Sequence, residues 1–144
     1  MRVFRTIFCA VTIGCGALWA YGADRAQAEG AIAFGSTGSV AKDGYSFGIN
    51  VNSSTEADAK RQALAWCRTH GSQVTQRECK IVTTFRYQCA AEAEDPKAGT
   101  PGFGWAVGAD EASAKSVAMD HCLATAGNRR EFCKVVNSLC DTKP

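Results

Sequence analysis

The sequence predicts an α+β fold made of two strand–helix–strand units, in which a mainly antiparallel sheet carries two helices on one face. Strand-like and helix-like segments follow one another in the same order in two parts of the chain, about residues 31–89 and 102–140. Both helix-like segments are rich in alanine and end in a cysteine. Six cysteines outside the N-terminal segment favour disulfide bonds between the elements.

The first repeated segment alternates large apolar residues with small or polar ones, as a half-buried strand does. In the first unit the apolar face consists of Tyr45, Phe47, Ile49 and Val51. Fifty-eight positions later the same pattern gives Phe103, Trp105, Val107 and Ala109. The short apolar segment 31–34 is expected to add a strand ahead of the first unit.

The second repeated segment predicts a helix in each unit, at an offset of 55 positions. Residues four apart share one helix face, and this face carries only small residues: Ala59, Ala63 and Cys67, and then Ala114, Ala118 and Cys122. Thr55 and Asp110 precede the two helices and are expected to cap them. Such small residues predict close packing of each helix on a sheet.

The third repeated segment predicts a strand that begins Cys79-Lys80 in the first unit and Cys133-Lys134 in the second. In the first unit its alternation continues to Cys89. Residues 90–101 contain three acidic residues, two prolines and a glycine, which is typical of an exposed loop. We therefore expect a linker of residues 90–101 between the two units.

Residues 1–28 have the features of a secretory signal peptide: an early positive charge, an apolar stretch and the small-x-small end Ala26-Gln27-Ala28. The expected organisation is a signal peptide over residues 1–28 and a single two-unit domain over residues 29–144. An alternative is lipidation at Cys15, although the residues before it match a lipobox poorly. Cleavage after Ala28 predicts an exported protein, periplasmic or secreted, with no membrane span after cleavage.

The charge balance argues against binding to nucleic acid. Without residues 1–28, Lys plus Arg falls from 16 to 13 and Asp plus Glu from 14 to 13, which leaves no formal net charge. Nucleic-acid binding needs clustered positive charge. The sequence also lacks the basic amphipathic helix that is typical of membrane-surface binding.

Six cysteines allow 15 disulfide connectivities, so their number alone leaves the pairing open. The repeat favours Cys67–Cys79 and Cys122–Cys133, each joining a helix end to the next strand. The remaining bond, Cys89–Cys140, would then join the two units. A zinc site is the alternative, but no Cys-x-x-Cys pair is present.

Three features resemble the domain-of-unknown-function family 4189, a family of exported bacterial proteins. They are the glycine-and-aromatic strand, the helix pattern from Ala59 to Cys67, and the Cys-Lys-hydrophobic-Val strand start. The resemblance covers about residues 31–140 and implies a small exported α+β domain. It implies no catalytic residue, because the family has no agreed activity.

The residues that could take part in catalysis or ligand binding each have a structural interpretation beside a functional one. His121 next to Cys122 suggests a Cys–His pair, but Cys122 has an expected disulfide partner. His70 lies where the dipole at the end of a helix favours a cation. The acidic residues Glu92, Glu94 and Asp95 suggest calcium binding or paired catalytic carboxylates, and a solvated loop is the structural interpretation.

Two groups of residues form the candidate binding surface. The strand aromatics are expected to face the core, unless the helices leave one sheet face uncovered. The basic pair after the second helix is a candidate anion or partner contact, or simply a basic turn. Together the candidates are Tyr45, Phe47, Phe103, Trp105, Arg129 and Arg130.

These patterns predict an exported, non-enzymatic interaction module whose partner is a protein or a component of the cell envelope. No catalytic residue, metal ligand or cofactor is assigned, and the oligomeric state stays open. One alternative is a small envelope hydrolase that uses Glu92, Glu94 or Asp120. Another is a passive structural component of the envelope.

Overall fold

The computed structural model describes residues 29–142, which form two three-stranded antiparallel sheets and several helices. The predicted α+β class is confirmed. The predicted signal peptide falls on residues 1–28 and lies outside the described residues. The elements in chain order are β1 (Glu29–Gly35), α1 (Val40–Asp43), β2 (Ser46–Ser53), α2 (Glu56–Cys67), α3 (Gln73–Gln76), β3 (Lys80–Phe85), β4 (Cys89–Glu94), β5 (Phe103–Gly108), α4 (Glu111–Thr125), a 3-10 helix (Gly127–Phe132) and β6 (Lys134–Cys140).

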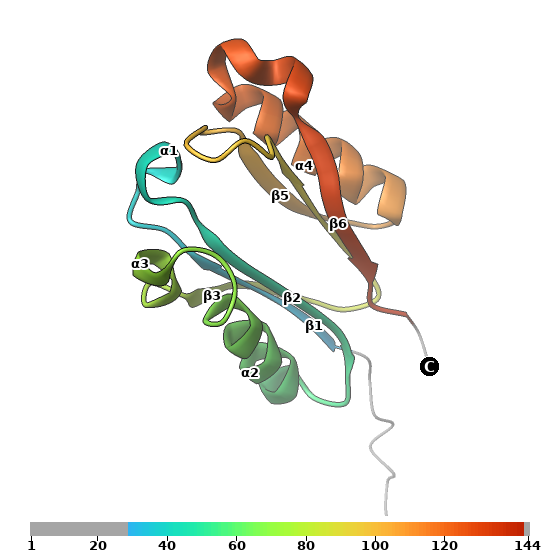
Figure 1. Ribbon diagram of the computed structural model, residues 1–144. Helices are drawn as coiled ribbons and strands as arrows, with labels where there is room; N and C mark the ends of the chain where they lie inside the picture. The colour runs from blue at the N-terminus through green and yellow to red at the C-terminus, as the bar shows by residue number, and fades with distance from the viewer. Residues whose placement is uncertain (1–28, 143–144) are drawn as a thin grey trace, which may run out of the picture.

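The two sheets have the same arrangement of strands. The first sheet has the order β2-β1-β3 and the second has the order β5-β4-β6. In each sheet the strand that comes first in the sequence lies at the centre. Figure 1 shows the sheets facing each other, with α2 on the outer side of the first and α4 on the outer side of the second. The expected single sheet with both helices on one face is therefore replaced by four layers.

The segment expected to be a linker is partly a central strand. Residues Cys89–Glu94 form β4, which pairs with both β5 and β6. The strand predicted to continue to Cys89 instead ends at Phe85, and Tyr87 has a left-handed backbone with φ of 53°. This bend carries the chain from the first sheet to the second.

Two glycines mark equivalent positions in the two sheets. Gly48 of β2 pairs with Ala33, and a Cβ atom at Gly48 would collide with the backbone of α2. Gly104 of β5 pairs with Ala93, and a Cβ atom there would collide with the backbone of α4. The strands are therefore offset by 56 positions, not the 58 that the alternation predicted. A slip of two residues keeps the same side chains on the same face, so alternation could not detect it.

The helices pack closely on their sheets through small side chains, as predicted. The inward residues of α2 and α4 are fully buried, at 0% exposure: Ala59, Ala63, Cys67, Ala114, Ala118 and Cys122. Both predicted caps are confirmed. Thr55 accepts a hydrogen bond from the Asp58 backbone, and Asp110 forms a capping box with Ser113.

The large apolar residues fill the space between the two sheets. The buried members of this inner core come from both sheets: Ile32, Phe47, Ile49, Phe85, Ala90 and Phe103. Phe103 of the second sheet stacks on Phe34 of the first at 5.2 Å and meets Phe47 edge-on at 5.7 Å. Each sheet thus covers the aromatic face of the other.

Three disulfides hold the elements together. Cys67–Cys79 and Cys122–Cys133 each join the end of a long helix to the residue before the next strand. Cys89 and Cys140 are directly opposite on β4 and β6. All three predicted pairings are present. The third bond lies within the second sheet, because Cys89, the last residue of the predicted first unit, is the first residue of β4, and the bond therefore does not join the two sheets.

The helices of the described part of the chain are short. The longest, α4, has 15 residues. Within residues 29–142, no helix combines the length and the apolar character needed to cross a bilayer.

Candidate functional site

Two glutamates of β4 face the first sheet. Glu92 and Glu94 alternate with Ala91 and Ala93, which pack against α4 on the other face. The Tyr45 hydroxyl, from the chain just before β2, lies 3.0 Å from Glu92 Oε1 and also contacts Glu94 Oε2. A phenol has one proton to donate, so these two carboxylates, here called the carboxylate pair, share a single donor.

The surroundings of the carboxylate pair shift its protonation. The pKa of Glu92 is raised to about 7: burial raises it most, the hydrogen bond from Tyr45 lowers it, and the negative charge of Glu94 raises it by a smaller amount. Burial and the two carboxylates together raise the pKa of the Tyr45 phenol, which therefore stays protonated. Near neutral pH, Glu92 is thus close to half ionised.

The first sheet builds the equivalent positions from apolar residues. Since Ala33 and Ala93 hold the same register against their partner glycines, Ile32 corresponds to Glu92 and Phe34 to Glu94. Ile32 is fully buried in the inner core, and Phe34 packs against it. The fold therefore does not need carboxylates here, and their burial costs stability.

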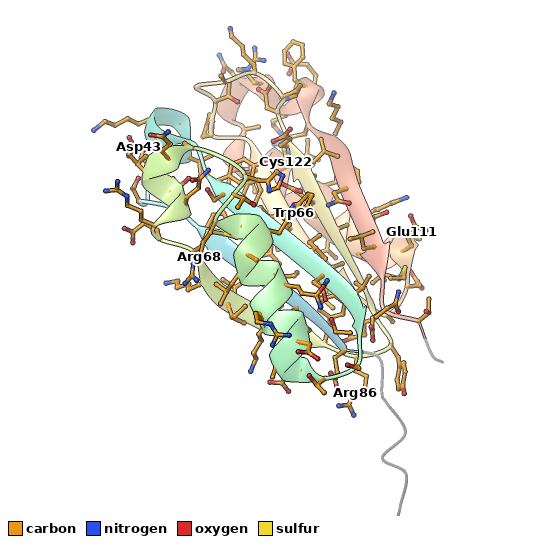
Figure 2. All side chains as sticks on the ribbon, turned by 60° about the horizontal axis from the view of Figure 1, so that its bottom comes forward. Asp43, Trp66, Arg68, Arg86, Glu111 and Cys122 are labelled. Carbon is orange, nitrogen blue, oxygen red and sulfur yellow. A yellow bond between two sulfur atoms is a disulfide. The ribbon has the colours of Figure 1, made fainter. Side chains whose placement is uncertain are left out.

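The carboxylate pair opens into a groove of about 380 Å³ between the two sheets. Its wall is aromatic on the side of the first sheet, where Trp66 of α2 is 54% exposed. Figure 2 shows Trp66 on the side of α2 that is turned toward the second sheet. The residues that line the groove are Gly44, Tyr45, Phe47, Trp66, His70, Gly71, Glu92 and Glu94.

The groove continues in both directions. At one end a smaller hollow of about 150 Å³ shares Tyr45 and Glu94 with it and extends to the loop of residues 96–102. At the other end a hollow of about 380 Å³ shares Trp66 with it and is also lined by Ile49 and Asn50 of β2. The three hollows follow one another and place the carboxylate pair near their middle.

The two histidines have structural contacts. His70 stacks on the Trp66 ring, with centroids 3.8 Å apart, and its Nδ1 lies 3.0 Å from the Trp66 carbonyl oxygen. His121 occupies the corresponding position to Trp66 on α4, and its Nδ1 lies 2.9 Å from the Trp105 carbonyl oxygen. Because Cys122 is disulfide-bonded, no thiol is next to His121.

The aromatic candidates separate into core and groove residues. Phe47 and Phe103 are buried at 7% and 8% exposure, and Trp105 packs against the same inner core. Tyr45 is half-buried and presents its hydroxyl to the carboxylate pair. The structure therefore brings Tyr45 and one edge of Phe47 to the groove, and leaves Phe103 and Trp105 in the packing between the sheets.

The basic candidates do not form one surface. Arg129 makes a two-bond contact with Asp95, from Nε to Oδ2 at 2.6 Å and from a terminal nitrogen to Oδ1 at 3.1 Å, and lies over the Phe132 ring. This guanidinium lowers the pKa of the Asp95 carboxyl. Arg130 is exposed. Arg129 thus has a structural role that fastens the loop after β4 to the 3-10 helix.

The three acidic residues that were predicted to lie in a solvated loop do not lie in one. Asp95 is buried and paired, and Glu92 and Glu94 lie between the sheets. Asp120, named with them as a candidate hydrolase residue, is exposed on α4, which covers the opposite face of the second sheet. Across residues 29–142, no three His, Cys, Asp or Glu side chains gather closely enough to hold a metal ion.

The groove residue that sequence reasoning missed is Trp66. Its signal was present in the comparison of the units, because a large aromatic residue on the flank of one helix corresponds to a histidine in the other.

Comparison with known proteins gives one match, to a protein family, and the matched range includes both sheets. Neither the curated proteins nor the solved structures yield a significant match. A sequence profile of the family described as "Domain of unknown function (DUF4189)" matches residues 30–140. That range contains β1 through β6 with all six bonded cysteines, apart from the first residue of β1. The resemblance seen in the sequence is thereby confirmed, and the chain belongs to this family.

Proposed function

We propose that this chain is an exported, non-enzymatic interaction module that binds a partner protein or envelope component through the groove beside Trp66. The observation that carries the proposal is that Trp66 is 54% exposed at the rim of a groove whose interior holds two carboxylates. Exposed tryptophans are frequent anchors at binding interfaces, because burying one removes a large apolar area from water. The helix does not require a tryptophan at this exposed position, since α4 has the exposed His121 there.

Export is supported by the disulfides. All six cysteines among residues 29–142 are paired, and such bonds persist in oxidising compartments. The signal-like character of residues 1–28 agrees with the same proposal.

A second candidate function, a small hydrolase, is favoured by one observation. Glu92, with a pKa of about 7, is suited to donate a proton, and Glu94 lies on the same face of the same strand. However, the Tyr45 hydroxyl occupies the position between the two carboxylates, where the bond to be cleaved would have to lie. The geometry therefore supports binding better than hydrolysis.

Retention of a partner by immobilised protein tests the proposal. The oxidised protein would be exposed to periplasmic and secreted fractions, as wild type, as Trp66→Ser and as the control Val117→Ser. Val117 is 41% exposed on α4, outside the groove. We expect wild type and the control to retain the same partner, and Trp66→Ser to lose at least about tenfold in affinity.

Two outcomes would contradict the proposal. Equal retention by Trp66→Ser would show that the groove is not the interface. Chemical conversion of the retained partner by wild type, lost in Glu92→Gln, would establish the hydrolase instead.

A further inference from the structure

We infer that the groove receives a lysine or arginine side chain from an extended polypeptide, with the cationic group held at Glu92 and Glu94. This inference rests on the proposed function and names the chemistry of its partner. Charge, aromatic lining and the course of the groove each support it separately.

The charge of the groove is unbalanced. Its lining contains Glu92, Glu94 and one histidine, His70, but no lysine or arginine. In the adjoining smaller hollow, Lys97 lies beside Asp95 in the lining. None of the ion pairs found among residues 29–142 includes either glutamate. Tyr45 supplies one proton, whereas each carboxylate can accept several hydrogen bonds. A group that brings positive charge and more than one N–H donor matches this deficit.

The aromatic wall fits the same kind of side chain. Tyr45, Phe47 and Trp66 line the groove together with the carboxylate pair. A cation is attracted to the face of an aromatic ring, and the attraction grows as water is excluded. The methylene stem of lysine or arginine packs on apolar surface while its charged end reaches a polar group. A neutral apolar side chain would leave the carboxylates without partners, at a cost in free energy.

The course of the groove points to a polypeptide. Ile49 and Asn50 are consecutive residues of β2, and consecutive strand residues point to opposite faces. A hollow that both residues line therefore reaches the edge of β2, and its opposite wall is formed by α2 and the turn after it, from Gln62 to His70. β2 is the outer strand of the first sheet. An extended segment following this edge can pair with the backbone of β2 and place one side chain in the carboxylate groove.

NMR titration of the isotope-labelled exported protein, with its disulfides intact, tests the inference. The probes are terminally blocked Gly-Gly-Lys-Gly-Gly, the same peptide with arginine, the same peptide with acetyl-lysine, and n-butylamine. We expect the lysine and arginine peptides to shift the indole N–H resonance of Trp66 at millimolar concentration. Acetyl-lysine, which lacks the charge, should bind at least about tenfold more weakly. Butylamine should also bind more weakly than the lysine peptide, because it cannot pair with β2.

Variants assign the preference to the carboxylate pair. Glu92→Gln combined with Glu94→Gln should abolish the difference between lysine and acetyl-lysine. The matched control combines Glu56→Gln with Glu111→Gln, two exposed glutamates in the first turns of α2 and α4. The control should keep the full difference.

Three results would overturn the inference. One is equal affinity for lysine and acetyl-lysine peptides, another is no Trp66 shift with any peptide, and the third is butylamine binding as tightly as the lysine peptide. Each leaves the proposed function standing if Trp66→Ser still loses the natural partner. Retention of that partner by Trp66→Ser would instead overturn the proposed function itself.

Discussion

At the scale of single residues, the position of Glu92 shows that a carboxylate in the groove lowers the stability of the fold. Ile32 fills the equivalent position in the first sheet without a polar atom to satisfy. Glu92 must either lose its charge or remain ionised with little solvent around it. The pKa of Glu92 is raised to about 7 because its ionised form is poorly solvated there. The carboxylate therefore reduces the stability of the folded chain progressively as the pH rises from 4.5 to about 7, and the full reduction is present above that range.

This cost predicts a pH dependence that belongs to Glu92. The unfolded side chain releases its proton near pH 4.5 and the folded one near pH 7, so the folded state binds more protons between these values. The free energy of unfolding consequently falls as pH rises through this window. Relative to wild type, Glu92→Gln should gain about 2 kcal/mol between pH 5 and pH 8.

Urea denaturation of both proteins at four pH values from 5 to 8 measures this difference. Glu56→Gln serves as the control, because Glu56 is exposed on α2 and should leave the profile parallel to that of wild type. A constant difference between Glu92→Gln and wild type would show that Glu92 is ionised throughout in the folded state.

At the scale of elements, the helices were predictable and the sheets were only partly so. Local signals define a helix: the four-residue spacing of Ala59 and Ala63, and the caps at Thr55 and Asp110, depend on near neighbours only. Strand partners are distant in the chain. The alternation around Phe47 gave the correct face but could not fix its register or its sheet.

β4 shows why the candidate site escaped prediction. Its sequence, Cys-Ala-Ala-Glu-Ala-Glu, has low strand propensity and lies beside a proline-containing loop. Central placement between β5 and β6 overrides that local preference. The burial of Glu92 and Glu94 depends on this placement, so local composition predicted solvated residues where the structure has a groove.

Close contact of strand and helix predicts the effect of a single methyl group. At Gly104 an added Cβ would collide with the backbone carbonyl of Ala118 and with the backbone nitrogen of Cys122, which cannot move aside as a flexible side chain could. We expect Gly104→Ala to lower the free energy of unfolding by at least about 2 kcal/mol.

The control for this substitution is Gly127→Ala, which follows α4. No atom lies within 4 Å of the added Cβ there, and only the left-handed backbone, with φ of 60°, opposes it. Its cost should be about 1 kcal/mol. Chemical denaturation of both variants gives the comparison, and an equal or smaller loss for Gly104→Ala would contradict close packing of β5 on α4.

At the scale of the whole molecule, polar contacts join the sheets on either side of their apolar core. In one contact Tyr45, beside the first sheet, binds the carboxylate pair of the second. In the other, Asp141 follows β6 and accepts hydrogen bonds from the backbone of Asn52, at 2.8 Å, and of Tyr87, at 2.9 Å. Directional contacts of this kind fix how two apolar faces meet, which burial of apolar area alone does not.

The Asp141 contact leads to a prediction about the seam between the sheets. Asp141 is 3% exposed, and both backbone groups that it binds belong to residues with a left-handed conformation, at φ of 58° and 53°. Replacing it with alanine removes both acceptors at once, and a buried donor that loses its partner costs about 1–3 kcal/mol. Asp141→Ala should therefore lower the free energy of unfolding by about 3 kcal/mol and increase binding of a dye that detects exposed apolar surface.

The control is Asp43→Ala, which removes an exposed contact with Thr37 and should change the free energy of unfolding by less than about 0.5 kcal/mol. If both variants unfold at the same urea concentration as wild type, the sheets are held in register by their apolar core alone.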